Sequence, residues 1–195
     1  MPHRRGRIAL SLAGLALAFG ASAGDATDAV FNAYQKLMSS KFAADVTVVS
    51  GGSTTRAHSE YDTVRRVHMK TDKMEMIVLP EGTWIRTGGQ WTQPPIDMSG
   101  MVRQFLPQST EDLRAMVRSA SDAGTSTWNG KDVHVYAYEV NTTVMGIHVT
   151  SSNKLFVDAS GKIVHAESSG EAMGKQSQTS QDITYDDGIN VVAPK

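Results

Sequence analysis

The sequence predicts an α+β domain, in which a curved antiparallel sheet of about ten strands forms an incomplete barrel and helices cover its concave face. Three observations lead to this prediction: an early apolar helical repeat, many short runs of alternating apolar and polar residues, and spacers of only two or three residues between several of these runs. Such short spacers join antiparallel neighbours, because a parallel crossover needs about a dozen residues or more. A sheet with so many strands is expected to curl around its own helices.

Residues 1–23 have the three parts of a secretory signal peptide. Three arginines precede an apolar run from Ile8 to Phe19, and Ala21-Ser22-Ala23 matches a cleavage site. The apolar run is too short to span a membrane, which takes about 20 residues. We therefore expect export to the periplasm and a single domain over residues 24–195. No cysteine follows the cleavage site, so we expect no lipid anchor.

The composition argues against several classes of protein. The chain contains no cysteine, which excludes disulfides, thiol catalysis and thiolate metal sites. Without the signal peptide, 16 basic residues (19 minus 3) stand against 20 acidic ones, a formal charge of −4 that does not favour nucleic acid. We find no G-x-S-x-G, H-E-x-x-H or phosphate-loop motif, and no i, i+4 histidine pair. An enzyme is disfavoured, and no cofactor or metal is predicted.

The first half of the mature chain predicts one helix followed by strands. A helix over residues 26–39 is indicated by an apolar stripe at helical spacing, formed by Val30, Phe31, Tyr34, Leu37 and Met38. The period then changes to two. Strands are predicted over residues 42–48, 54–61, 64–70, 73–79, 83–87 and 90–93.

The second half predicts a helical insertion and then further strands. Apolar residues at helical spacing after Pro94-Pro95 and again after Pro107 indicate two short helices, over residues 96–106 and 110–117. Beyond Gly124 the period returns to two. Strands are predicted over residues 131–140, 144–151, 154–158, 162–168 and 179–185.

The stretch HMKTDKMEMIV, residues 68–78, combines a histidine with three methionines, all of which can be copper ligands. Hairpin register places Met69 opposite Met74 and His68 opposite Glu75, on opposite faces of the sheet. The histidine therefore points away from the methionines. Copper binding by converging methionines without His68 is left as an alternative.

The same register arithmetic predicts an apolar face that lines a ligand cavity. A type I turn at Leu79–Gly82 places Trp84 opposite Val78, and a Gly88-Gly89 turn pairs Arg86 with Trp91 on that side. Arg65 and Arg86 project into this face as candidates for contacts with a head group or at the cavity mouth. An alternative is ordinary core with arginine stems at its edge. The predicted cavity residues are Val46, Val48, Val67, Met69, Met74, Met76, Val78, Trp84 and Trp91, with Met101 and Phe105 from the inserted helices as part of a lid.

Two local signatures connect the chain to a known family. Pro80–Trp84 contains an E-G turn between two predicted strands, the second of which carries the tryptophan. Asp158–Gly161 is a D-x-x-G turn, and a closing extended segment ends near Pro194. With the order of elements, they resemble the bacterial lipoprotein-carrier superfamily (LolA/LolB-like, including related mycobacterial glycolipid-binding lipoproteins), over essentially the whole mature chain. The resemblance implies a half-barrel whose apolar concave face accommodates acyl chains. Its cavity-guarding arginine corresponds most nearly to Arg65, which lacks the following proline.

Two functions fit these observations. The first is a periplasmic carrier or binding protein for a lipid, a lipoprotein acyl chain or another hydrophobic ligand, because methionines repack around flexible chains and ten methionines is a high count for this length. Its partners would be a lipid or an acylated protein, with only transient membrane contact. The alternative is an envelope regulatory or interaction module with a protein partner, since the superfamily includes envelope-stress sensor domains.

Overall fold

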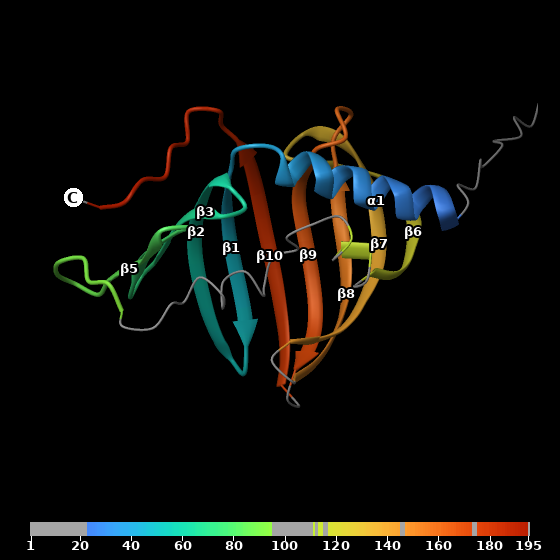
Figure 1. Cartoon of the computed structure of the whole chain (residues 1–195). Coiled ribbons are helices and arrows are strands. Elements are labelled where there is room, and N and C mark those ends of the chain that lie inside the picture. The colour runs from blue at the N-terminus through green and yellow to red at the C-terminus, as the bar shows by residue number, and fades with distance from the viewer. Residues whose placement is uncertain are drawn as a thin grey trace, which may run out of the picture.

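One antiparallel sheet of ten strands and a single helix, α1 (Ala23–Met38), make up most of the described chain (Figure 1). The computed structural model describes residues 23–94, 111, 113–114, 117–144, 147–172 and 175–194. Residues 1–22 of the predicted signal peptide and the predicted helix over 96–106, with Met101 and Phe105, lie outside these ranges. The strands are β1 (Phe42–Ser50), β2 (Ser53–Thr63), β3 (Arg66–Thr71), β4 (Glu75–Leu79), β5 (Gly82–Arg86), β6 (Val117–Trp128), β7 (Lys131–Val144), β8 (Ile147–Val157), β9 (Ile163–Ala172) and β10 (Lys175–Tyr185).

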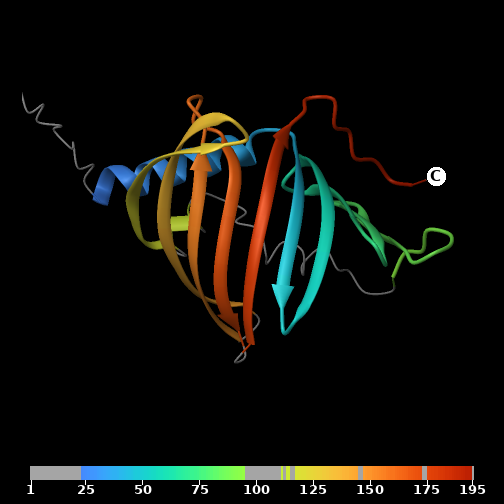
Figure 2. The same cartoon turned by 180° about the vertical axis from the view of Figure 1, so that it is seen from behind.

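The sheet consists of two meanders joined in the middle. Its strand order is β5-β4-β3-β2-β1-β10-β9-β8-β7-β6, so β1–β5 form one meander, β6–β10 form the other, and β1 pairs with β10. Strands β5 and β6 lie at the two edges, and the sheet does not close into a barrel (Figures 1 and 2). The predicted incomplete antiparallel barrel of about ten strands is confirmed.

Helix α1 lies against one side of the second meander, on the face that we call concave (Figure 1). Its buried side recurs at helical spacing, with Ala26, Val30 and Ala33 almost fully inaccessible, and packs in one cluster with Leu155 of β8 and other sheet residues. The Tyr34 and Tyr138 hydroxyls lie 2.7 Å apart. Burial raises the pKa of both phenols, so this link between helix and sheet stays uncharged at neutral pH.

The prediction of several helices covering the concave face is corrected: α1 is the one helix whose bounds fall within the described residues, and Glu111, Leu113 and Arg114 are also helical. The molecule is mostly β, and the predicted helix over 110–117 is wrong at its end, because Val117 begins β6. We missed β6 because its sequence, VRSASDAGTSTW, is dominated by small polar residues and lacks a clear apolar alternation. Register shifts near its start and middle further break the period.

Two smaller corrections concern strand ends. The predicted strands over 144–151 and 154–158 are a single strand, β8, because the polar Ser151–Asn153 stretch continues the ladder with β7 and β9. The predicted strand over 90–93 is reduced to one bridge, between Ile85 and Thr92. Main-chain pairing in the second meander is therefore more continuous than the pattern of apolar residues predicts. At the β5 edge the pairing is shorter than that pattern predicts.

Replacing Leu155 with alanine tests the core between α1 and the sheet. Leu155 is 1% exposed, and deleting a buried leucine side chain costs about 2–5 kcal/mol because it leaves a cavity. Leu155→Ala should lower the free energy of unfolding in urea by that amount. Val49→Ala is the control, since Val49 is 41% exposed on β1 and its truncation should cost only about 0.5 kcal/mol. Equal losses in the two variants would contradict the assigned core.

Candidate functional site

The β3–β4 hairpin places the methionines on the concave face and His68 on the other, convex face. Met69 lies opposite Met76, and His68 lies opposite Ile77. The predicted register was wrong by two residues, because Thr71 and Met74 close the turn with a backbone hydrogen bond of 2.8 Å. A shift of two residues keeps every side chain on its face, since side chains alternate with a period of two. The predicted separation of the histidine from the methionines is therefore confirmed.

Seven of the predicted cavity residues share the concave face. Val46 and Val48 lie on β1, and the remaining five form what we call the methionine strip: Val67, Met69, Met74, Met76 and Val78 on β3, its turn and β4. Val67, Met76 and Val78 are buried, whereas Met69 and Met74 are half-buried. Tyr61 of β2 and Ile85 of β5 extend the strip sideways as the cross-strand partners of Val67 and Met76.

The predicted placement of Trp84, Trp91 and Arg86 on this face is wrong. Leu79 pairs directly with Gly82, so Trp84 lies opposite Ile77 and not opposite Val78. A shift of one residue turns a whole strand over, which puts Trp84 and Arg86 on the convex face. Trp91 packs there as well, in the cluster of Ile77 and Leu79.

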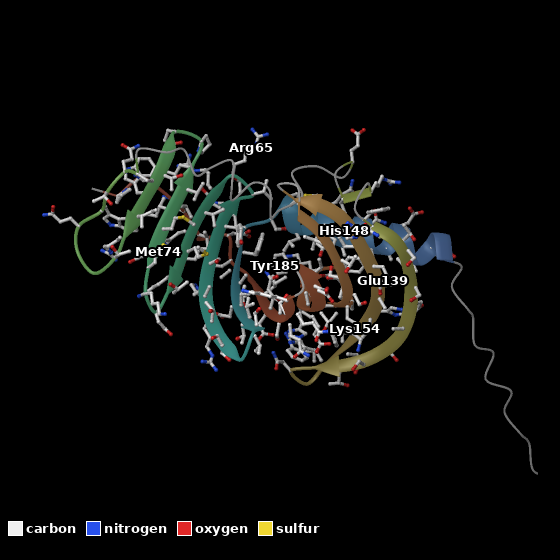
Figure 3. The ribbon with its side chains drawn as sticks, turned by 90° about the horizontal axis from the view of Figure 1, so that it is seen from below. Arg65, Met74, Glu139, His148, Lys154 and Tyr185 are labelled. Atoms are coloured by element: carbon white, nitrogen blue, oxygen red, sulfur yellow. The ribbon has the colours of Figure 1, made fainter. Side chains whose placement is uncertain are left out.

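Neither predicted arginine reaches the methionine strip. The Arg86 Nε donates to Glu75 Oε2 at 3.0 Å, and its guanidinium lies over the Trp91 ring at 4.7 Å from the centroid. Arg65 is exposed in the turn that precedes β3, whereas Met74 follows the other end of β3 (Figure 3). The strip therefore carries no charged side chain of its own.

A row of charged side chains crosses the convex face behind the strip. His68 Nδ1 lies 3.1 Å from Glu60 Oε2, and its Nε2 lies 2.8 Å from Glu75 Oε1. Arg86 completes the row through its contacts with Glu75. Burial alone would raise the pKa of Glu75, but hydrogen bonds from Arg86 and His68, together with their charges, lower it below its ordinary value. The row ties β2, β3, β4 and β5 together.

The concave face changes polarity along the strands. Near the start of β1 its cross-strand row reads Val78, Val67, Tyr61 and Phe42. Near the far end of β1 the row that runs from β1 across β10, β9 and β8 is made of small and mostly hydroxylated residues: Ser50, Ser177, Gly170 and Ser151. One end of this face is therefore apolar and the other is hydroxyl-rich.

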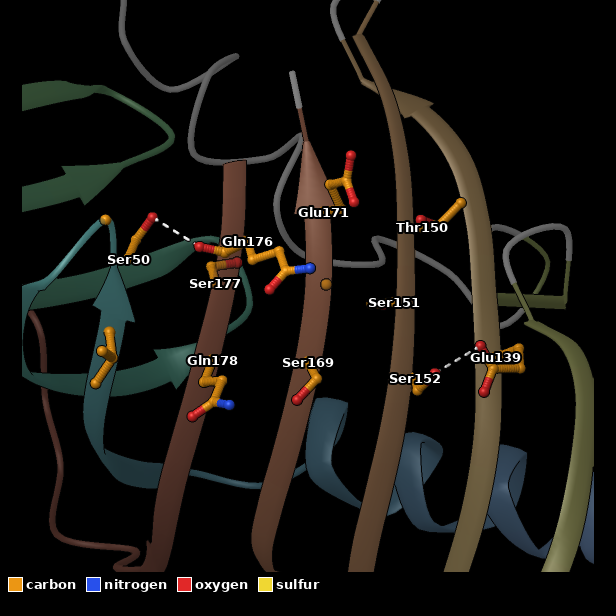
Figure 4. Close-up of a pocket in the computed structure, with 13 residues that line it drawn as sticks. Ser50, Glu139, Thr150, Ser151, Ser152, Ser169, Glu171, Gln176, Ser177 and Gln178 are labelled. Atoms are coloured by element: carbon orange, nitrogen blue, oxygen red, sulfur yellow. Dashed lines mark hydrogen bonds between the residues drawn. The ribbon is translucent and has the colours of Figure 1, made fainter. Parts of the chain in front are cut away.

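A groove of about 530 Å³ lies on the convex face of β1 and β7–β10, and the four residues of the hydroxyl-rich row also border it (Figure 4). Its face follows from alternation, because Tyr138 reaches α1 while the next residue, Glu139, lines the groove. Ser152 donates to Glu139 at 3.0 Å. Apart from Val49 its lining is polar or glycine, and sequence analysis did not single it out because serines and glutamines on a strand are ordinary surface residues.

Within the described ranges, no three His, Asp or Glu side chains converge to hold a metal ion. No helix in those ranges has the length and hydropathy that a membrane span requires.

Comparison with known proteins identifies the fold. No protein-family model matches the sequence, and no curated protein matches it significantly. The lipoprotein LppX of Mycobacterium tuberculosis superposes with a TM-score of 0.55 at 10% identity, covering 85% of this chain and 97% of LppX. LprF from Mycobacterium bovis superposes with a TM-score of 0.56 at 9% identity, covering 88% and 97%. At this identity the likeness shows the fold alone, and it confirms the LolA-like fold that the sequence resemblance implied.

Replacing Glu75 with glutamine tests the convex charge row. A carboxylate whose pKa is lowered in the folded state stabilises the fold above its unfolded pKa of about 4.3 and loses that contribution as the pH falls through the folded pKa. Glu75→Gln should therefore lower the free energy of unfolding at neutral pH, by up to about 1 kcal/mol because the Arg86 partner is 41% exposed.

The difference from the unmodified protein should shrink below about pH 4. Urea denaturation at a series of pH values measures it. Glu60→Gln serves as the control, since Glu60 is 40% exposed and should contribute less. A Glu75→Gln deficit that stays constant from neutral to acid pH would refute the role assigned to Glu75.

Proposed function

We propose that this protein is a periplasmic carrier or binding protein that holds a lipid, a lipoprotein acyl chain or another hydrophobic ligand on its concave face. The observation that carries the proposal is the methionine strip, five apolar side chains on one face of β3, its turn and β4. Helix α1 packs chiefly on β6, β7 and β9, which belong to the other half of the sheet. The LolA-like fold supports the proposal without identifying the ligand.

The chemistry of the strip suits a flexible apolar ligand. Methionine is unbranched and polarisable, so Met69, Met74 and Met76 can repack around chains of different shape. Each methylene that moves from water into such surroundings contributes about 0.8 kcal/mol. Because charged residues of β3 and β4 lie on the convex face, an alkyl chain on the strip would not have to displace a buried ion.

The polarity gradient suggests how an amphipathic ligand would lie. Its apolar part would contact the strip and Val46, while a polar head group would point toward the hydroxyl-rich end of the face near Ser50 and Ser177. Neither Arg65 nor Arg86 is needed in this arrangement. The function requires no cofactor, and contact with a membrane would be limited to loading and release.

The test is to look for bound lipid directly. Protein purified from the periplasm without detergent would be analysed by native mass spectrometry, and its organic extract by lipid mass spectrometry. We expect a bound mass that disappears on extraction and is recovered as lipid. Protein with no adduct, no extractable lipid and no uptake of added lipid would contradict the proposal. A stable envelope protein partner found under the same conditions would then favour the interaction module.

A charge on the strip should abolish binding. Met69→Lys would place an ammonium group among apolar neighbours on the concave face, and desolvating it on ligand binding costs several kcal/mol. We expect Nile red or fatty-acid affinity to fall at least about tenfold. His68→Lys is the matched control, because it puts the same charge one residue away on the convex face beside Glu60 and Glu75. Equal losses in the two variants would show that the strip is not the binding surface.

A further inference from the structure

The C-terminal segment, residues 186–194, leaves the end of β10 and runs past the strand ends of the first meander (Figures 1 and 2), where it packs on convex-face residues of β4. It leaves the sheet through a turn in which Asp186 accepts a hydrogen bond of 2.8 Å from the Gly188 amide. Its side chains then alternate, since Ile189 and Val191 are buried whereas Val192 is 54% exposed. The segment therefore has the in-and-out pattern of a strand, although it belongs to no ladder of the sheet.

Apolar contacts attach this segment to the first meander. Ile189 and Val191 form one buried cluster with Ile77 and Leu79 of β4, against which Trp84 and Trp91 also pack. Met76 and Val78 alternate with these residues along β4 and belong to the methionine strip on the opposite face. One short strand thus connects the C-terminal segment to the candidate ligand-binding face.

Polar contacts fix the segment at two carbonyl groups. Lys41 Nζ donates to the Ile189 carbonyl at 2.8 Å and also contacts Asp62 Oδ1 at 2.8 Å. The Arg66 guanidinium donates to the Val191 carbonyl through Nη2 at 2.9 Å and Nε at 3.2 Å. The hydrogen bond from Lys41 is the main reason that the pKa of Asp62 lies below its ordinary value.

Apart from the contacts of the C-terminal segment, β3–β5 are held to the rest of the sheet by the β2–β3 ladder and by the contact of His68 with Glu60 in the charge row. These strands have six, five and five residues, and the ladder between β2 and β3 is interrupted by a register shift between Tyr61 and Thr63. The C-terminal segment bypasses this ladder, because it runs from β10 in the centre of the sheet directly to β4. It is placed to hold β3–β5 in one orientation relative to β1.

We propose that residues 186–194 act as a strap that controls the methionine strip. While the strap is bound to β4, strands β3–β5 keep the curvature that suits a ligand. When the strap is released, β3–β5 move away from β1 and the affinity of the strip for its ligand falls. The proposal rests on the proposed function, because it concerns the regulation of the same face. Nothing in it requires the strap to touch the ligand. The strap is a positioning element, acting through Ile77 and Leu79 on Met76 and Val78.

Two adjacent valines provide a matched test. Val191→Ser removes a buried methyl pair from the strap, whereas Val192→Ser makes the same change at an exposed position of the same segment. Each full-length variant would be compared with the unmodified protein by hydrogen exchange of backbone amides and by Nile red titration. We expect Val191→Ser alone to speed exchange in β4 and β5, with β7–β9 unchanged, and to weaken Nile red binding about fivefold or more.

Three other outcomes would overturn the strap proposal. If Val191→Ser speeds exchange in β4 and β5 but binds Nile red as tightly as the unmodified protein, the strap does not control the strip, and the proposed function is unaffected. Faster exchange across both meanders would mean global destabilisation and would also overturn the strap. If the unmodified protein binds neither Nile red nor lipid, the proposed function fails, and the strap proposal fails with it.

Discussion

The pairing of β1 with β10 holds the two halves of the sheet together. It joins residues 42–50 to 177–185, almost the two ends of the described chain, and without it the two meanders would be separate sheets. Phe42 packs at its start, stacked on Tyr61 with ring centroids 4.4 Å apart and close to Tyr185. Because this contact is so distant in sequence, the chain must close a long loop before it gains the pairing. Helix α1 and the C-terminal segment both attach to the ends of these two strands, so the pairing also places the elements on either face.

Because side chains alternate along each strand, the two faces of the first meander have different compositions. Residues 76–79 of β4 are all buried, although β4 lies next to an edge strand. Met76 and Val78 belong to the methionine strip on the concave face, and the C-terminal segment covers Ile77 and Leu79 on the convex face. This explains the continuous apolar run MIVL where a half-exposed strand would alternate. The charges that such a strip must exclude lie on the convex side, in the row from Glu60 to Arg86. In the proposed function, the ligand would contact the concave face of these strands, while the charge row and the C-terminal contacts lie on the convex face.

The sequence predicted the face of a side chain correctly where the error in strand register was an even number of residues, and wrongly where the error was odd. The predicted β3–β4 register was off by two residues, which left Met69 and Met76 on the correct face, whereas the predicted β4–β5 register was off by one, which placed Trp84 and Arg86 on the wrong face. Strand β6 was missed because an edge strand of small polar residues has no apolar period. The strap was predicted only as an extended tail. The alternation of Ile189, Asn190 and Val191 was a signal for burial on one side, but the sequence cannot show which surface lies beneath it.

The NMR response of the methionine methyl groups to lipid would show whether the methionine strip contacts a bound ligand. In protein with isotope-labelled methionine methyls, a spin-labelled fatty acid broadens signals from methyls close to the bound chain. Met38, the last residue of α1, does not belong to the strip and serves as the comparison. If the methionine strip binds the ligand, the Met69, Met74 and Met76 signals will broaden first and will recover when unlabelled lipid competes. If these three signals stay sharp while others broaden, or if none changes, the concave strip is not a ligand-binding site.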